Sequence, residues 1–161
     1  INLGLDAGDF AVLFSCFGIG AVIGALTVGT RLADVAPRRT VTVGLCGFAV
    51  SLTAFTLLEV PAVAYPVVGL CGFFYFVVIT SLSTTIQVNV DDAHRGRIMG
   101  LWMMAWAGLV PVGNLIAGPV IDRIGHQPVM LFGAAVALGL AAFRLPESPR
   151  HDVVAPPSPH T

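Results

Sequence analysis

Long apolar stretches alternate with short charged segments along the chain. Five stretches contain no Asp, Glu, Lys or Arg, and they cover residues 10–30, 40–58, 60–90, 98–121 and 124–143. A helix needs roughly 20 apolar residues to cross the hydrocarbon core of a bilayer, so each stretch is long enough to span it. The pattern predicts an all-α polytopic membrane protein with a transmembrane domain over residues 1–145. Its five helices are expected near residues 10–30, 40–58, 62–88, 98–121 and 125–143.

The overall composition is typical of a membrane protein. Hydrophobic residues make up 56% of the chain and charged residues only 11%, whereas about 25% charged residues is typical of soluble domains. The formal net charge of −1 predicts no nucleic-acid partner, because nucleic-acid binding requires a clustered basic face. Residues 146–161 are polar and rich in Pro, which predicts a disordered tail.

The basic residues, all of them arginine, divide unevenly between the two sides of the predicted membrane domain. With five crossings, seven fall on one side: Arg31, Arg38, Arg39, Arg95, Arg97, Arg144 and Arg150. Only Arg123 falls on the other side. Cytoplasmic loops carry the excess of Lys and Arg. We therefore predict a multi-pass protein of the cell (inner) membrane, with the N-terminus of this segment outside and the C-terminal tail in the cytoplasm.

The predicted spans contain no constellation of side chains suited to catalysis or metal binding. The three cysteines lie in apolar stretches, and no two of them have CxxC spacing. Catalysis within the bilayer would need a nucleophile with a base, or a set of metal ligands. We therefore predict that the chain is not an enzyme and binds no metal or cofactor. The lack of ionisable side chains within the spans favours an apolar or amphiphilic substrate over a small ion.

Small residues recur at helical spacing in two of the spans. Gly20 and Gly24 form a GxxxG pattern, which lets two helix backbones approach closely in lipid. Gly108, Pro111, Gly113 and Gly118 are further candidates for helix packing. The pattern fits ordinary tight packing, and it also fits a surface that slides during a conformational cycle.

The first charged loop contains Asp34, Arg38 and Arg39. This arrangement resembles the cytoplasmic-loop motif of the major facilitator superfamily, G-x3-D-[RK]-x-G-[RK]-[RK]. Three positions depart from the motif and hold Thr30, Val35 and Pro37. The resemblance implies a charged gate that holds the cytoplasmic face shut. The alternative is a solvated basic loop that only sets the orientation in the membrane.

A second region, residues 85–125, extends the resemblance. Gln87, the sequence Arg95-Gly96-Arg97, and the spacing Gly108-x2-Pro111-x-Gly113 are similar to the tenth-to-eleventh-helix region of facilitator exporters, above all the enterobactin-exporter-like efflux branch. The resemblance implies that Arg95 and Arg97 belong to the same gate. It also implies that the five spans correspond to helices 8–12 of a twelve-helix transporter, with the substrate bound between its two halves. Because the chain begins at Ile1 and not at Met, we expect the N-terminal transporter helices to lie outside it.

Polar residues within the spans are the candidates for substrate contact. Thr80, Ser83 and Gln87 are spaced to share one helical face, and Asn114 and Trp106 lie in the next span. Serine and threonine can instead bond to their own helix backbone, and tryptophan can serve as an interfacial anchor. The expected function is transmembrane transport of a small molecule, in the direction of efflux, by alternating access. The alternative is a five-helix structural or accessory membrane protein without transport activity.

Overall fold

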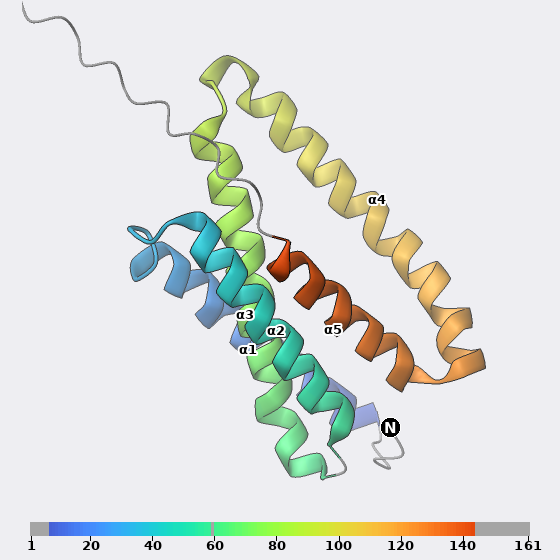
Figure 1. Cartoon of the computed structure of the whole chain (residues 1–161). Helices are drawn as coiled ribbons and strands as arrows, with labels where there is room; N and C mark the ends of the chain where they lie inside the picture. The colour runs from blue at the N-terminus through green and yellow to red at the C-terminus, as the bar shows by residue number, and fades with distance from the viewer. Residues whose placement is uncertain (1–6, 59, 144–161) are drawn as a thin grey trace, which may run out of the picture.

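The computed structural model describes residues 7–58 and 60–143, and within these residues the chain forms five α-helices (Figure 1). They are α1 (Ala7–Thr30), α2 (Pro37–Leu57), α3 (Pro61–Asn89), α4 (Asp92–Ile124) and α5 (His126–Ala142). The predicted all-α fold is confirmed. The predicted tail at residues 146–161, together with Arg144 and Arg150, lies outside the described residues.

Proline and glycine set several of the helix boundaries. Pro37 and Pro61 occupy the first turns of α2 and α3. Proline fits there because it lacks an N–H, and the N–H groups of a first turn have no partner within the helix. Gly125 alone separates α4 from α5 and has a φ of 83°, a backbone conformation that glycine adopts without steric cost.

The start of α4 differs from the sequence expectation. Residues 91–97 were expected to form a loop, but α4 begins at Asp92, so Arg95 and Arg97 lie in its first turns. The length of a charge-free stretch reflects the thickness of the hydrocarbon core and not the length of the helix. A helix can continue into water because its backbone hydrogen bonds are internal. At about 1.5 Å per residue, the 33 residues of α4 extend about 50 Å, well beyond a hydrocarbon core of roughly 30 Å.

Four of the five helices, α1 to α4, are long and apolar enough to cross a membrane. The fifth, α5, is apolar but has only 17 residues, fewer than the 125–143 span that we expected. A helix of that length extends about 25 Å and stands at the lower limit for crossing a bilayer.

Helix α3 is the centre of the packing. It lies against α1 on one side and against α2 on another, and α2 in turn packs against α5 (Figure 1). The α2–α5 contact is built from small side chains, with Ala49, Ala134 and Ala137 buried and Leu52 packed against them. Such residues allow the close backbone approach that associates helices in lipid.

The closest approach joins α1 to α3 through glycines of both helices. A Cβ added at Gly20 would overlap the carbonyl oxygen of Gly69, and one at Gly24 would overlap that of Phe73. From the other side, a Cβ at Gly72 would overlap the carbonyl oxygen of Phe17. The two backbones are therefore in contact, and no larger residue fits at these positions without moving the helices apart.

Helix α4 runs apart from this packed group (Figure 1). Its contacts are with α5, to which Gly125 joins it, and with α3 through a pair of aromatic rings. None of its described side chains is buried. The long apolar surface of α4 is therefore turned outward from the described part of the chain.

The glycine contact predicts an asymmetric response to alanine. Gly20→Ala should lower the free energy of unfolding by about 1–3 kcal/mol, the usual cost of overpacking, because the new methyl group meets backbone atoms of α3. Gly18→Ala is the matched control in the same helix, since nothing lies within 4 Å of its Cβ position. The measurement is thermal unfolding of the detergent-solubilised protein followed by circular dichroism. Equal stability of the two variants would contradict the contact.

Candidate functional site

An aromatic junction connects four of the helices. Tyr75 of α3 lies 6.0 Å from Phe17 of α1, 5.7 Å from Phe48 of α2 and 6.2 Å from Trp106 of α4, measured between ring centroids. The Tyr75–Trp106 pair is edge-to-face, the geometry in which the positive edge of one ring meets the negative face of the other. Trp102 continues the cluster along α4, with its ring 6.4 Å from that of Trp106.

Tyr75 was not among the residues singled out from the sequence. It stands in the run Phe73-Phe74-Tyr75-Phe76, where a single hydroxyl among aromatic rings was the available signal. Only the packing shows that this ring, and not its neighbours, reaches α1, α2 and α4 together. Tyrosine and tryptophan combine large apolar surfaces with one polar atom each, which suits them to contact apolar or amphiphilic molecules.

The predicted polar face of α3 lies along the helix from this junction. Ser83 and Gln87 are joined, because Gln87 Nε2 donates a hydrogen bond of 3.1 Å to Ser83 Oγ. Thr80 and Ser83 are half-buried and Gln87 is exposed. The twelve positions from Tyr75 to Gln87 correspond to about 18 Å along the helix axis. The amide therefore lies at the loop end of α3, away from the aromatic rings.

Asn114 does not join these groups. It is exposed on α4, eight positions beyond Trp106, which corresponds to about 12 Å along the axis. Because α3 and α4 run in opposite directions, Asn114 lies on the far side of the aromatic junction from Gln87. Of the five candidates for substrate contact, only Ser83 and Gln87 are joined by a side-chain hydrogen bond in the described structure.

The candidate gate residues lie at one end of the helices. Asp34 belongs to the loop between α1 and α2, and Arg38 and Arg39 lie in the first turn of α2. The first turns of α4 contain Arg95 and Arg97. Because successive helices reverse direction, the start of α4 lies at the same end of the helices as the α1–α2 loop. All five side chains are exposed. Among the described residues, Asp34 and Arg39 form no ion pair with each other.

The packing candidates separate into two groups. Gly20 and Gly24 lie in the α1–α3 contact, whereas a Cβ at Gly108, Gly113 or Gly118 of α4 would meet no described atom within 4 Å. Pro111 is inside α4 and is exposed. The small residues of α4 therefore form an open surface within the described part of the chain.

A polar contact at the opposite end of the helices was also missed from the sequence. Tyr65 of α3 donates a hydrogen bond of 2.9 Å from its hydroxyl to Asp9 Oδ1 in the first turn of α1. A carboxylate is favourable at the N-terminus of a helix because of the helix dipole. The two residues are 56 positions apart, so nothing local in the sequence pairs them.

Comparison with known proteins gives a consistent family assignment. The family model of the Major Facilitator Superfamily matches residues 1–160. The alpha-ketoglutarate permease of Bacillus subtilis (strain 168) is 28% identical over 131 residues, which cover 78% of this chain and 30% of the permease. The enterobactin exporter EntS of Citrobacter koseri is 32% identical over 139 residues, which cover 85% of this chain and 32% of the exporter.

A third relative is the multidrug efflux pump Tap of Mycolicibacterium fortuitum, 23% identical over 141 residues, which cover 86% of this chain and 34% of the pump. The chain thus spans about a third of the length of these curated relatives. No solved structure matches the chain.

The contact between Tyr75 and Trp106 is expected to stabilise the packing of α4 against α3. In a double-mutant cycle, Tyr75→Leu and Trp106→Leu should show a coupling energy of about 0.5–1.5 kcal/mol, because the edge-to-face contact is lost in either single variant. The readout is the free energy of unfolding in detergent. Pairing Tyr75→Leu with Phe132→Leu is the control, since Phe132 of α5 is 71% exposed and has no ring contact with Tyr75. Strict additivity for the Tyr75–Trp106 pair would contradict the contact.

Proposed function

The chain belongs to the major facilitator superfamily, and on that premise we propose that it forms part of a transporter that moves an apolar or amphiphilic small molecule across the membrane by alternating access. In this proposal its five helices take the place of helices 8–12, and the partner that completes the pathway is the remaining set of transporter helices. Such folds bind substrate near the bilayer midplane, between two halves built from repeats.

The observation that carries the proposal is the aromatic junction at Tyr75 and Trp106. Its rings lie in the middle of α3 and α4, and the described side chains of α4 around Trp106 are exposed and not packed in a core. An apolar or aromatic substrate would gain contact with these rings, while the tryptophan N–H can donate one hydrogen bond and the tyrosine O–H can donate or accept one.

The charge-free interior supports this substrate class. Residues 98–121 and 60–90, which form most of α4 and α3, contain no Asp, Glu, Lys or Arg. A charged substrate or a proton relay within the membrane would require ionisable partners. These helices would therefore contribute shape, apolar contact and neutral hydrogen bonds, and we assign them no catalytic role.

We propose efflux as the direction and the cytoplasm as the location of the arginine-rich end. Two of the relatives carry the names of exporters or efflux pumps, which favours export. Arg31, Arg38, Arg39, Arg95 and Arg97 gather at one end of the helices, and cytoplasmic loops carry such an excess.

Substrate contact at the aromatic junction is tested by efflux of a fluorescent amphiphile from cells that produce the transporter in its native genetic context. Trp106→Ala should raise dye accumulation several-fold, because the substrate loses its largest aromatic contact. Leu109→Ala is the matched control on the same helix, since its side chain is 75% exposed and has no described ring contact. If both variants export the dye like the parent protein, the junction is not a substrate site. If the parent protein itself exports nothing, the accessory function is favoured.

The role of the arginine-rich end is tested with a fourfold variant in which Gln replaces Arg38, Arg39, Arg95 and Arg97. We expect impaired efflux, inverted topology, or both, because these charges anchor the loops on the cytoplasmic side. Dye efflux and the accessibility of single reporter cysteines in the loops measure the two effects. Arg123→Gln, at the other end of α4, is the control and should change neither. Unchanged efflux together with unchanged topology in the fourfold variant would contradict the proposed gate and orientation.

A further inference from the structure

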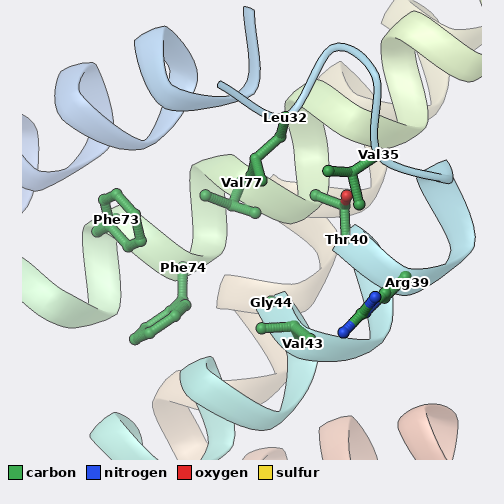
Figure 2. A pocket seen from close by; sticks show the side chains of 9 residues that line it. All are labelled: Leu32, Val35, Arg39, Thr40, Val43, Gly44, Phe73, Phe74 and Val77. Atoms are coloured by element: carbon green, nitrogen blue, oxygen red, sulfur yellow. The ribbon is translucent and has the colours of Figure 1, made fainter. Parts of the chain in front are cut away.

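A pocket of about 290 Å³ lies at the arginine-rich end, where the α1–α2 loop meets α2 and α3 (Figure 2). The loop contributes Leu32 and Val35, α2 contributes Arg39, Thr40, Val43 and Gly44, and α3 contributes Phe73, Phe74 and Val77. Its volume is at the lower end of the range for small-molecule sites. The walls are almost entirely apolar, and the polar groups come from one place, the first turn of α2.

Thr40 has an unusual hydroxyl for this protein. Eight serine and threonine hydroxyls in the described helices donate to the carbonyl four residues earlier, at 2.7–2.9 Å: Ser15, Thr27, Thr30, Thr42, Ser51, Thr53, Thr56 and Thr85. Thr40 Oγ1 has no partner among the described residues, although the residue is only 5% exposed. A buried hydroxyl without a partner is costly, so a group that enters the pocket and bonds to it is stabilised.

Ser81 is the second buried hydroxyl without a described partner, and the helix register places it near Thr40. A Cβ at Gly44 would meet Val77 and Val78, and one at Gly47 would meet Phe74, so α2 and α3 run antiparallel in a fixed register. Continued by one turn, this register sets Ser81 opposite Thr40. Neither hydroxyl has a partner among the described residues, and of the two only Thr40 lines the pocket.

The same end of the pocket is positively charged. Arg39 lines it with an exposed guanidinium for which the described residues provide no ion pair. The first turn of α2 has no side-chain cap, and the helix dipole adds to the positive potential at this end. Residues 31–39 contain three arginines and one aspartate. Figure 2 shows Thr40 between Val35 and Val43, with its hydroxyl oxygen turned toward the loop.

The polar and apolar parts of the pocket are ordered along the membrane normal. Arg39 is the last charged residue before the apolar stretch that begins at Thr40, so it marks the membrane–water interface. Val43 and Gly44 lie one turn deeper, and the register puts Phe74 deeper still. A membrane lipid has the same order, with its charged headgroup at the interface and its acyl chain below.

We propose that this pocket binds an anionic phospholipid of the surrounding leaflet. The phosphate is held by the Arg39 guanidinium and the Thr40 hydroxyl, and one acyl chain lies against Val43, Phe73 and Val77. Basic pockets between transmembrane helices are suited to such headgroups. The small volume admits only part of one chain and not a whole lipid, so the rest of the molecule stays in the bilayer. Because the loop residues Leu32 and Val35 close one side of the pocket, occupancy would hold the α1–α2 loop against α3.

The test is native mass spectrometry of the purified full chain with added dioleoyl-phosphatidylglycerol or dioleoyl-phosphatidylcholine. The parent protein should retain the anionic lipid in preference to the zwitterionic one. Arg39→Gln should reduce that preference about fivefold, the effect of one basic residue near a membrane surface. Arg31→Gln is the control, since it removes an exposed arginine of the same loop that does not line the pocket. Equal binding of both lipids by the parent protein, or equal losses in the two variants, would overturn the proposal.

Two further pairs of variants test the Thr40 hydroxyl and the chain slot, by which we mean the apolar part of the pocket at Val43, Phe73 and Val77. Thr40→Val should weaken retention of phosphatidylglycerol, whereas Thr42→Val, whose hydroxyl bonds to its own helix, should not. Val43→Trp should block the slot and reduce retention of the anionic lipid. Val50→Trp, on the same helix, is the control and should not reduce it. The side chains of Val43 and Val50 are 57% and 66% exposed, so both sites admit the larger group. Circular dichroism confirms that each variant is folded.

Competition distinguishes a lipid from other anions. Inorganic phosphate should fail to displace phosphatidylglycerol at millimolar concentration, because it makes no contact with the apolar walls. If phosphate displaces the lipid fully, the site is an anion site without a chain slot, and the proposal is wrong. Preferred retention of free lauric acid over phosphatidylglycerol would likewise overturn the assignment to a membrane lipid.

Discussion

In lipid, apolar side chains gain nothing from leaving the solvent, so helices associate through close packing and hydrogen bonds. This constraint explains why the tightest contact in the protein is between glycines. Gly20 and Gly24 of α1 meet Gly69 and Phe73 of α3 at backbone distance, and Gly72 meets Phe17 in return. With these backbones in contact, α3 is fixed as the helix against which α1 and α2 are arranged.

The position of α3 explains two features of the structure for which we propose functions. At its middle, Tyr75 reaches rings on three other helices and provides the contact with Trp106 of α4. In the same stretch of α3, Phe73, Phe74 and Val77 form one wall of the pocket whose other side holds Thr40. We propose the aromatic junction as the contact for substrate, while the pocket lies at the border of the charged loop, where a lipid headgroup would be found.

Prediction from the sequence was most successful where one residue type alone determines a structural feature. Absent charges predicted the five helices, and GxxxG spacing picked out Gly20 and Gly24, which the structure places against α3. It failed at the start of α4, because a helix can extend past the membrane into charged residues such as Arg95. It also grouped Asn114 with Gln87, although antiparallel helices place them on opposite sides of the aromatic junction. Helical spacing reports which residues share a face of one helix, but not the level at which two helices meet.

The sequence by itself determined that the helices lie in a bilayer and which segments are helical, because a bilayer requires long charge-free segments with internal backbone hydrogen bonds. The motif residues Asp34, Arg38 and Arg39 by themselves also indicate the family. Tertiary structure alone decided which faces meet. The pairing of Tyr65 with Asp9, the central place of Tyr75 and the unsatisfied hydroxyls of Thr40 and Ser81 all depend on the register between helices far apart in the chain. That register is set by the shapes of the contacting surfaces, which no local pattern of residues records.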